Sequence, residues 1–258
     1  MKFLLPLRSA RRGAGMAFAL ALNFLDFACL RAAHHGWKLR RNLPLTTRAH
    51  WMQRSCKRVA RALHLSIHEQ GTLPQSGLIA SNHLSYLDIL AYAATMPCVF
   101  VSKSEVRGWP VFGLLAKLGG TLFVERERRT GVESLSRQMK AVLKAGLPLV
   151  LFPEGTSTDG SVVLPYYPSL LQPALDCEVA ITPAAIGYSA QGTAEEQLCY
   201  YGEISFAPHL MSVLRIKQTR ATVYFGSPEA RLTDRKEAAR ELRDRTLALR
   251  EELRRNIR

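Results

Sequence analysis

The sequence lacks paired cysteines, internal repeats and low-complexity linkers. Its five cysteines are scattered and include no C-x-x-C pair, which argues against a disulfide framework and against a cysteine-based zinc site. This usage is typical of reduced thiols in a cytoplasmic environment. With 258 residues, of which 47% are apolar, the chain is long enough for one large domain with a real core.

Acidic residues are almost missing from the first 65 positions. That segment holds 13 Lys and Arg residues and one acid, Asp26, so it carries +12 of the total formal charge of +14. The rest of the chain is close to neutral, and its aromatic residues do not alternate with cations. A nucleic-acid binder would carry its basic face on the folded domain, so nucleic acid is not an expected partner.

No apolar run reaches the roughly 20 residues that a bilayer-spanning helix needs. The run 16–30 is flanked by arginines and interrupted by Asn23 and Asp26, which would share one face of a helix. A second stretch, 46–65, alternates cations with apolar residues, as a helix lying on an anionic membrane surface does. We therefore predict basic membrane-associating helices over 1–68, which anchor the protein to the cytoplasmic face of the cell membrane.

Three alternatives remain for this N-terminal segment. A cleaved signal peptide would share its basic start, but no clean small-residue cleavage site follows the apolar run. A single short transmembrane anchor is compatible with 16–30. A helix packed by its apolar face on the domain core is compatible with the same pattern.

Beyond residue 70, apolar runs alternate with helical patterns. The run 147–152 has no polar alternation, as expected of a strand buried on both faces. The alternation predicts an α/β fold for 69–258, with a mixed, largely parallel central sheet flanked by helices. The predicted strands are 77–81, 98–102, 121–125, 147–152, 178–188 and 220–228, and the predicted helices are 86–95, 110–119, 132–146 and 233–256.

Three polar clusters follow predicted strands, at the sheet edge where α/β proteins build their sites. The first, SNHLSYLD at 81–88, contains His83 and Asp88. A histidine is the commonest general base, and a carboxylate that orients it and stabilises its cation completes such a pair. The same stretch is also compatible with a plain helix start, with Ser85 as the cap and Asp88 favouring the helix dipole.

The second cluster is GTLFVERERR at 120–129 and the third is FPEGTS at 152–157. Arg126 is either a solvated cation at a strand end or a clamp for an anion. Glu154 could bind a polar head group, and the backbone N–H groups of Gly155 and Thr156 could face an anion. Neither G-x-S-x-G nor G-x-x-x-x-G-K-[ST] occurs, so a serine-hydrolase elbow and a P-loop are unsupported.

Together these boxes resemble those of the lysophospholipid (glycerolipid) acyltransferase family. NHLSYLD at 82–88 is similar to its N-H-x-x-x-x-D box, and KSEVRGWPVFG at 103–113 to the stretch that follows it. GTLFVER at 120–126, FPEGTS and ITPAAI at 181–186 resemble its later boxes, in the family's order. The resemblance covers roughly 75–190, and the conjunction is far more specific than any single box.

The resemblance implies an acyltransferase domain that uses no cofactor and no metal. His83, oriented by Asp88, would take the proton of a lysolipid hydroxyl, whose oxygen would attack the thioester of acyl-CoA or acyl-carrier protein. The expected partners are the lysolipid acceptor, that acyl donor and the anionic membrane surface. The residues expected to bind substrate are Lys103, Arg126, Glu154, Gly155 and Thr156. An apolar tunnel for the acyl chain is expected near 110–120.

The expected acceptor is 1-acyl-sn-glycerol-3-phosphate, giving phosphatidic acid in phospholipid biosynthesis, and the alternative is a lyso-ornithine lipid. Family members that act on the phosphate commonly carry Arg after E-G-T and a lysine further on. Here Ser157 stands in the first place, and Tyr166–Tyr167 occur without a lysine. The segment around 201–210 also resembles acyltransferases of lyso-ornithine lipids, which lack a phosphate. A non-catalytic membrane adaptor is the last alternative, but it would be expected to lose His83 or Asp88.

Overall fold

The computed structural model describes residues 4–35, 42–124, 129–229 and 232–257. Its centre is a seven-stranded sheet in the order β1-β7-β6-β2-β5-β3-β4. Neighbouring strands are parallel except for the antiparallel pair β6 and β7, so the predicted mixed, largely parallel α/β fold is confirmed. The strands are β1 (Leu65–Gln70), β2 (Leu78–Ser81), β3 (Val99–Lys103), β4 (Leu122–Val124), β5 (Leu149–Leu151), β6 (Ile181–Ser189) and β7 (Thr219–Phe225).

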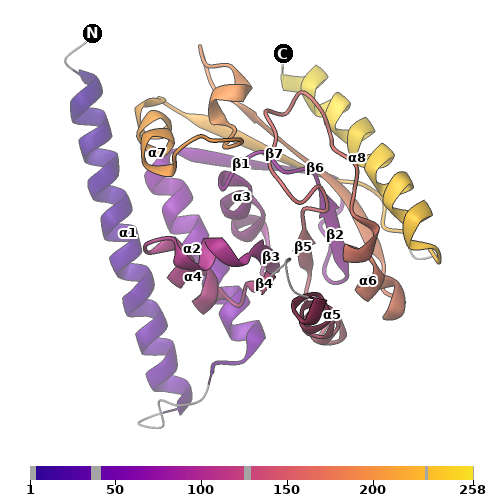
Figure 1. The fold of residues 1–258 in the computed structure, drawn as a ribbon. Helices are drawn as coiled ribbons and strands as arrows, with labels where there is room; N and C mark the ends of the chain where they lie inside the picture. The colour runs from indigo at the N-terminus through magenta and orange to yellow at the C-terminus, as the bar shows by residue number, and fades with distance from the viewer. Residues whose placement is uncertain (1–3, 36–41, 125–128, 230–231, 258) are drawn as a thin grey trace.

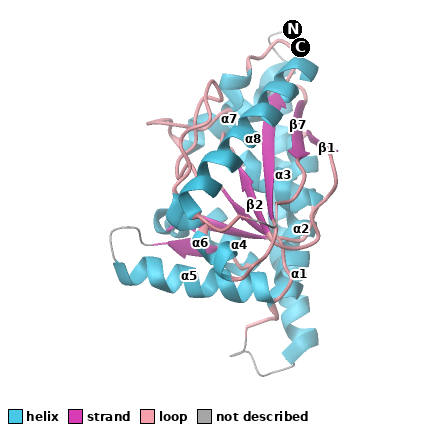
Figure 2. Ribbon diagram, turned by 90° about the vertical axis from the view of Figure 1, so that its right-hand side faces the viewer, coloured by secondary structure: helices cyan, strands magenta, loops and turns pink. Residues whose placement is uncertain are grey.

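Helices cover both faces of the sheet, and two apolar cores lie between them and the strands (Figure 1). Side chains of β2 alternate between these cores, with Ile79 in one and Leu78 and Ala80 in the other. Figure 2 shows the strand directions fanning out, as in any twisted sheet. One face carries α1 (Leu4–His35), α2 (Leu45–Leu63), α3 (Leu87–Thr95), α4 (Phe112–Gly119) and α7 (Phe206–Arg215); the other carries α5 (Arg129–Lys144), α6 (Gln172–Asp176) and α8 (Arg235–Ile257). Short 3-10 helices occur at η1 (Ser104–Gly108), η2 (Pro168–Leu170) and η3 (Glu195–Leu198).

The strand β1 was missed at the sequence level. Its residues, LSIHEQ, are mostly polar because it lies at the edge of the sheet, where it pairs with β7 alone. His64, in the left-handed conformation with φ of 55°, ends α2 immediately before β1 begins. The predicted boundary between 68 and 69 therefore falls inside a strand of the central sheet. The helix α7 was also missed.

The helix α2 differs from the membrane-surface helix expected over 46–65. Its apolar side is buried, with Trp51 fully covered, and packs against α3, α4 and the neighbouring core. Apolar side chains that are already buried against protein are not available to contact a membrane. The alternative of a helix packed on the domain core is therefore the one that fits α2.

The helix α1 is longer than the apolar run 16–30 suggested. Among the described residues, its segment Arg8–His34 is the one stretch long and apolar enough to cross a membrane, by length and composition only. It packs against α2 and α7 along one side. Its other side exposes Phe18 and Leu25, 66% and 61% accessible.

Candidate active site

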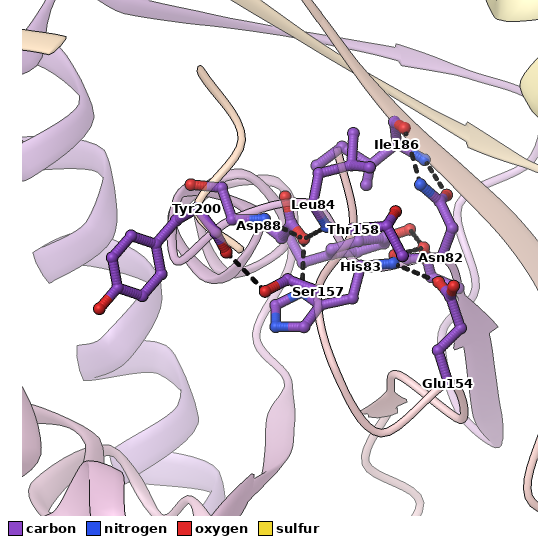
Figure 3. A network of polar contacts seen from close by, with 12 residues as sticks. Asn82, His83, Leu84, Asp88, Glu154, Ser157, Thr158, Ile186 and Tyr200 are labelled. Atoms are coloured by element: carbon purple, nitrogen blue, oxygen red, sulfur yellow. Dashed lines mark hydrogen bonds and ion pairs between the residues drawn. The ribbon is translucent and has the colours of Figure 1, made fainter. Parts of the chain in front are cut away.

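His83 and Asp88 meet at the carboxyl end of the central strand β2. The chain leaves β2 at Ser81, turns through Asn82 to Tyr86, and enters α3 at Leu87. Nδ1 of His83 lies 2.6 Å from Oδ2 of Asp88 (Figure 3). The imidazole is 24% exposed and the carboxylate is fully buried. The bond to Asp88 therefore engages Nδ1 and leaves Nε2 as the nitrogen that can accept a proton from a substrate.

The carboxylate of Asp88 accepts hydrogen bonds from other groups besides the imidazole. The backbone N–H groups of Leu84 and Ser85 donate to the same Oδ2, at 2.8 and 3.2 Å, and the hydroxyl of Tyr188 donates to Oδ1. The position before the helix is Tyr86, and no side chain caps it, so Ser85 is not the cap considered above. The side chain of Asp88 instead points back to the turn before the helix. The N–H groups there donate to its carboxylate and offset the cost of burying the charge.

Asn82 fixes the turn to the neighbouring strand. Its side-chain amide donates to the carbonyl of Ile186 at 3.1 Å, and its carbonyl accepts the N–H of Ile186 at 2.8 Å (Figure 3). This pair of bonds replaces the ladder where β2 has already ended and β6 continues. The residue before the base is thereby held in one place.

Glu154, in the loop after β5, contacts the backbone of the base rather than the cavity. The N–H of His83 donates to Oε1 at 2.8 Å and the N–H of Leu164 donates to Oε2 at 2.7 Å. Burial raises the pKa of Glu154 to about 7, and these two N–H donors oppose that rise. Since both oxygens are occupied and the side chain is buried, this geometry does not fit the expected head-group contact.

The same loop also holds the carbonyl group and the ring of His83. The N–H of Thr158 donates to the carbonyl of His83 at 3.0 Å. The ring of Phe152 stacks on the imidazole with centroids 4.2 Å apart. Residues 152–158 thus contact the N–H, the carbonyl and the ring of His83.

Between Glu154 and Thr158, Gly155 is buried, Thr156 is exposed and Ser157 is half-buried. Gly155, at φ of 71°, makes the turn, and its N–H donates to the carbonyl of Phe152 at 3.1 Å, so this amide is not free for an anion. Thr156 is exposed and lines the cavity. The hydroxyl of Ser157 donates to the carbonyl of Tyr200 at 2.5 Å, which fixes the loop to the chain after η3.

A cavity of about 240 Å³ opens beside His83 and its partner Asp88. His83, Lys103, Gly155 and Thr156 line it, so the structure brings these predicted residues together. Arg126 lies outside the described residues. No group of three or more His, Cys, Asp or Glu side chains within the described ranges is placed to hold a metal ion.

A second, apolar cavity of about 100 Å³ adjoins the first. The two share Tyr86, Ile89 and Trp109 in their walls. The apolar cavity extends from there towards Met52 and Val59 of α2 and Leu115 of α4. Shared apolar walls therefore separate the cavity beside His83 from the one that reaches α2 and α4.

Comparison with known proteins places this geometry in a family. Residues 64–187 match the Acyltransferase family. The chain is 36% identical over 249 residues to the lyso-ornithine lipid O-acyltransferase of Brucella abortus, covering 90% of each protein. It is 30% identical to the 1-acyl-sn-glycerol-3-phosphate acyltransferase of Neisseria gonorrhoeae, over 59% of this chain and 60% of that protein. The crystal structure of the 1-acyl-sn-glycerophosphate acyltransferase PlsC from Thermotoga maritima superposes with a TM-score of 0.67 at 16% identity, covering 98% and 97% of the two chains.

The chain belongs to the lysophospholipid acyltransferase family. It is an acyltransferase of lipid metabolism, as the sequence boxes predicted. Its fold is that of the Thermotoga structure, with long N-terminal helices before the mixed sheet.

Two residues of the site were not recognised from the sequence. Tyr188 lies near the end of a mostly apolar strand, so the sequence pattern gave no reason to separate it from the core residues. Its hydroxyl nevertheless donates to Asp88, which is 100 positions away in the sequence. Asn82 stood inside the first box, and its position directly before the histidine was the only signal for its bonds to Ile186.

Proposed function

We propose that this protein transfers a fatty acyl group from acyl-CoA or acyl-carrier protein to the free hydroxyl of a lyso-ornithine lipid. The observation that carries the transfer is the His83–Asp88 pair, bonded at 2.6 Å beside a cavity. The observation that favours this acceptor is the relative from Brucella abortus, which is similar along nearly the whole chain. The order of the two acceptors is thus the reverse of the one first expected from the sequence.

The chemistry needs one base and two held reactants. Nε2 of His83 removes the proton of the acceptor hydroxyl as its oxygen attacks the thioester carbonyl. The new ester C–O bond forms, the C–S bond breaks, and the departing thiolate takes the proton back from His83. Asp88 stabilises the imidazolium that exists between these steps, and placement of both substrates supplies much of the remaining acceleration.

Few cations line the part of the main cavity that the structure describes. Lys103 is the one Lys or Arg among the described residues that line the main cavity, beside the hydroxyl groups of Ser102, Thr156 and Ser157. A phosphate dianion in such a place calls for more positive charge, whereas the carboxylate of an ornithine head group calls for less. The adjoining apolar cavity then suits an acyl chain.

The helix α1 holds the enzyme at the cytoplasmic surface of the membrane. Phe18, Leu22 and Leu25 are exposed on it, and cations flank the apolar stretch. Apolar side chains with flanking Lys and Arg suit a helix that enters an anionic interface. The domain beyond it carries the chemistry.

The proposal is tested with purified full-length protein in detergent. Labelled acyl-CoA and acyl-carrier protein are each offered with lyso-ornithine lipid or with 1-acylglycerol-3-phosphate. Wild type is expected to acylate the ornithine lipid, and His83→Ala to lose that activity by about 10²- to 10⁴-fold while its circular dichroism is unchanged. His68→Ala, at an exposed histidine of β1, is the matched control and should keep wild-type turnover.

Each outcome separates the parts of the proposal. Product from the phosphate acceptor alone would keep the acyltransferase and replace the acceptor, in line with the relative from Neisseria gonorrhoeae. Full activity in His83→Ala would remove the base from the mechanism.

A further inference from the structure

The strand β6 runs past the end of the strand beside it and carries a tyrosine over the active site. The parallel pairing of β2 with β6 stops at Ser81 opposite Ala184, while β6 continues to Ser189. Tyr188 lies in that extension and is 1% exposed. Its hydroxyl donates to Oδ1 of Asp88, the oxygen that the imidazole does not use.

The backbone that carries Tyr188 is itself anchored. The N–H of Tyr188 donates to Oε1 of Glu195 at 2.7 Å, and the second oxygen of Glu195 pairs with Arg250 of α8, whose side chain is 1% exposed. The backbone of Tyr188 is therefore held in place beside Asp88 by contacts of its own. Burial raises the pKa of the Tyr188 hydroxyl, so the group stays protonated and remains a donor at every working pH.

The two oxygens of Asp88 have separate duties. Oδ2 holds the imidazole and two backbone N–H groups, whereas Oδ1 accepts the tyrosine hydroxyl. A donor on one oxygen draws charge from the other and makes the carboxylate a weaker base. A weaker carboxylate stabilises the imidazolium less, and the base then returns its proton more readily.

We propose that Tyr188 is a positioning residue that sets how tightly His83 holds the proton it takes from the acceptor, acting through Asp88. The inference rests on the proposed role of His83 as the base. Without the hydroxyl, Oδ1 is a buried and unpaired acceptor, the carboxylate becomes a stronger base, and His83 becomes neutral only at higher pH. The cost falls on turnover and not on acceptor binding.

Other groups surround the pair and must be held constant. Tyr92 of α3 offers the matched control, because it is equally buried and near Asp88, but its hydroxyl donates to Ser81 at 2.6 Å. Tyr92→Phe removes the same atom and breaks no bond to the carboxylate. Other titratable or charged groups near the pair, within the described part of the chain, include Tyr86, Lys103, Glu154, Glu195, Cys199, Tyr200 and Arg250.

The decisive measurement does not depend on the acceptor. Diethyl pyrocarbonate modifies unprotonated imidazole, so the rate of modification of His83 against pH, read by fragment-ion mass spectrometry, reports when the ring is neutral. In Tyr188→Phe the midpoint of this profile should move up by roughly 0.5 to 1 pH unit. Tyr92→Phe should leave it in place, and His68 in the same digest serves as an internal reference.

A second substitution gives the opposite sign without removing an atom. Replacing Tyr188 by 3-fluorotyrosine makes the phenol a stronger donor and should move the midpoint down. An unmoved midpoint in both Tyr188 proteins, or an equal shift in Tyr92→Phe, would overturn the inference.

Activity profiles complete the test. With whichever acceptor the wild type acylates, Tyr188→Phe should lower kcat several-fold with KM unchanged, and the rising acid side of its pH profile should shift in the same direction as the modification profile. Failure of the wild type to acylate either acceptor would sink the proposed function, while the modification profile would still decide the role of Tyr188.

Discussion

The helices α1 and α2 both combine cations with apolar residues, but they have different surroundings. Both are basic, both carry Trp, Phe, Leu or Met along their length, and both were expected to lie on a membrane. In the structure α2 turns its apolar side to the core, whereas α1 packs by one side and leaves Phe18 and Leu25 exposed on the other. The comparison teaches that basic residues beside apolar ones do not by themselves identify a membrane-bound helix, because α2 has no exposed apolar side left after packing and α1 has one.

Polar residues of α1 point to the same conclusion. Asn23 is buried, and its backbone carbonyl accepts the indole N–H of Trp51 at 3.1 Å. Arg58 of α2 donates to the side chains of Asn23 and Asp26, at 3.0 and 2.9 Å. Arg12 of α1 donates to carbonyls at the end of α7, so this cation is not free for lipid. The polar residues that interrupt the apolar run thus mark the side of α1 that meets protein.

The largest effect is expected from Trp51→Ala in α2. The substitution removes a fully buried indole together with its hydrogen bond to the carbonyl of Asn23 and leaves a cavity, so unfolding free energy should fall by about 3 to 5 kcal/mol. Urea unfolding followed by circular dichroism measures the loss. Lys57→Ala, on the exposed side of the same helix, is the control, and an equal stability of the two variants would contradict the core assignment of α2.

An intermediate effect is expected on membrane binding from the double substitution Phe18→Gln and Leu25→Gln in α1. Each exposed apolar side chain that enters the bilayer contributes about 1.5 to 3 kcal/mol, so flotation with anionic vesicles should show at least a tenfold weaker binding. Unfolding free energy should change little, because both side chains are already in solvent. Val162→Gln, at an exposed residue outside α1, should float like wild type; binding that survives in the double variant would exclude this face as the anchor.

The smallest effect is expected where the two helices join. Arg58→Met deprives the buried Asn23 of one donor and Asp26 of its nearer cation, at a cost of about 1 to 2 kcal/mol in unfolding free energy. Arg61→Met, at an exposed position of α2, should be neutral within about 0.5 kcal/mol. If the Arg58 variant is just as neutral, α1 is held to α2 by its apolar contacts alone.

The sequence could predict contacts that are local. His83 and Asp88 stand on one turn and the start of one helix, so their spacing suggested a pair, and the resemblance of the neighbouring boxes strengthened that prediction. The alternation of buried runs likewise predicted every strand from β2 to β7. The edge strand β1 could not be recognised in this way, because a strand with one neighbour and a solvated face has no continuous apolar run.

Contacts that depend on strand register could not be predicted. Glu154 reaches the N–H of His83 only because β5 lies parallel to β2, with Leu151 opposite Ala80, so that both loops leave the sheet at one edge. Tyr188 reaches Asp88 only because β6 outlasts β2. Neither length of overlap can be inferred from the local sequence pattern, and for this reason the bonds of Glu154 to the backbone of His83 and Leu164 were not expected.

Glu154 binds the N–H of His83 and Thr158 binds its carbonyl, and these two contacts have a consequence for how such an enzyme can diverge. The outer bonds of the loop hold the base, while Thr156 and Ser157 between them face the cavity and its rim. We therefore expect that substitution of Thr156, which is exposed in the cavity, can change which lipid is accepted without displacing His83, whereas substitution of Ser157 would also remove its bond to Tyr200. On the proposed function, the residue that meets the lipid and the residues that hold His83 would be neighbours in one short loop and could still change independently.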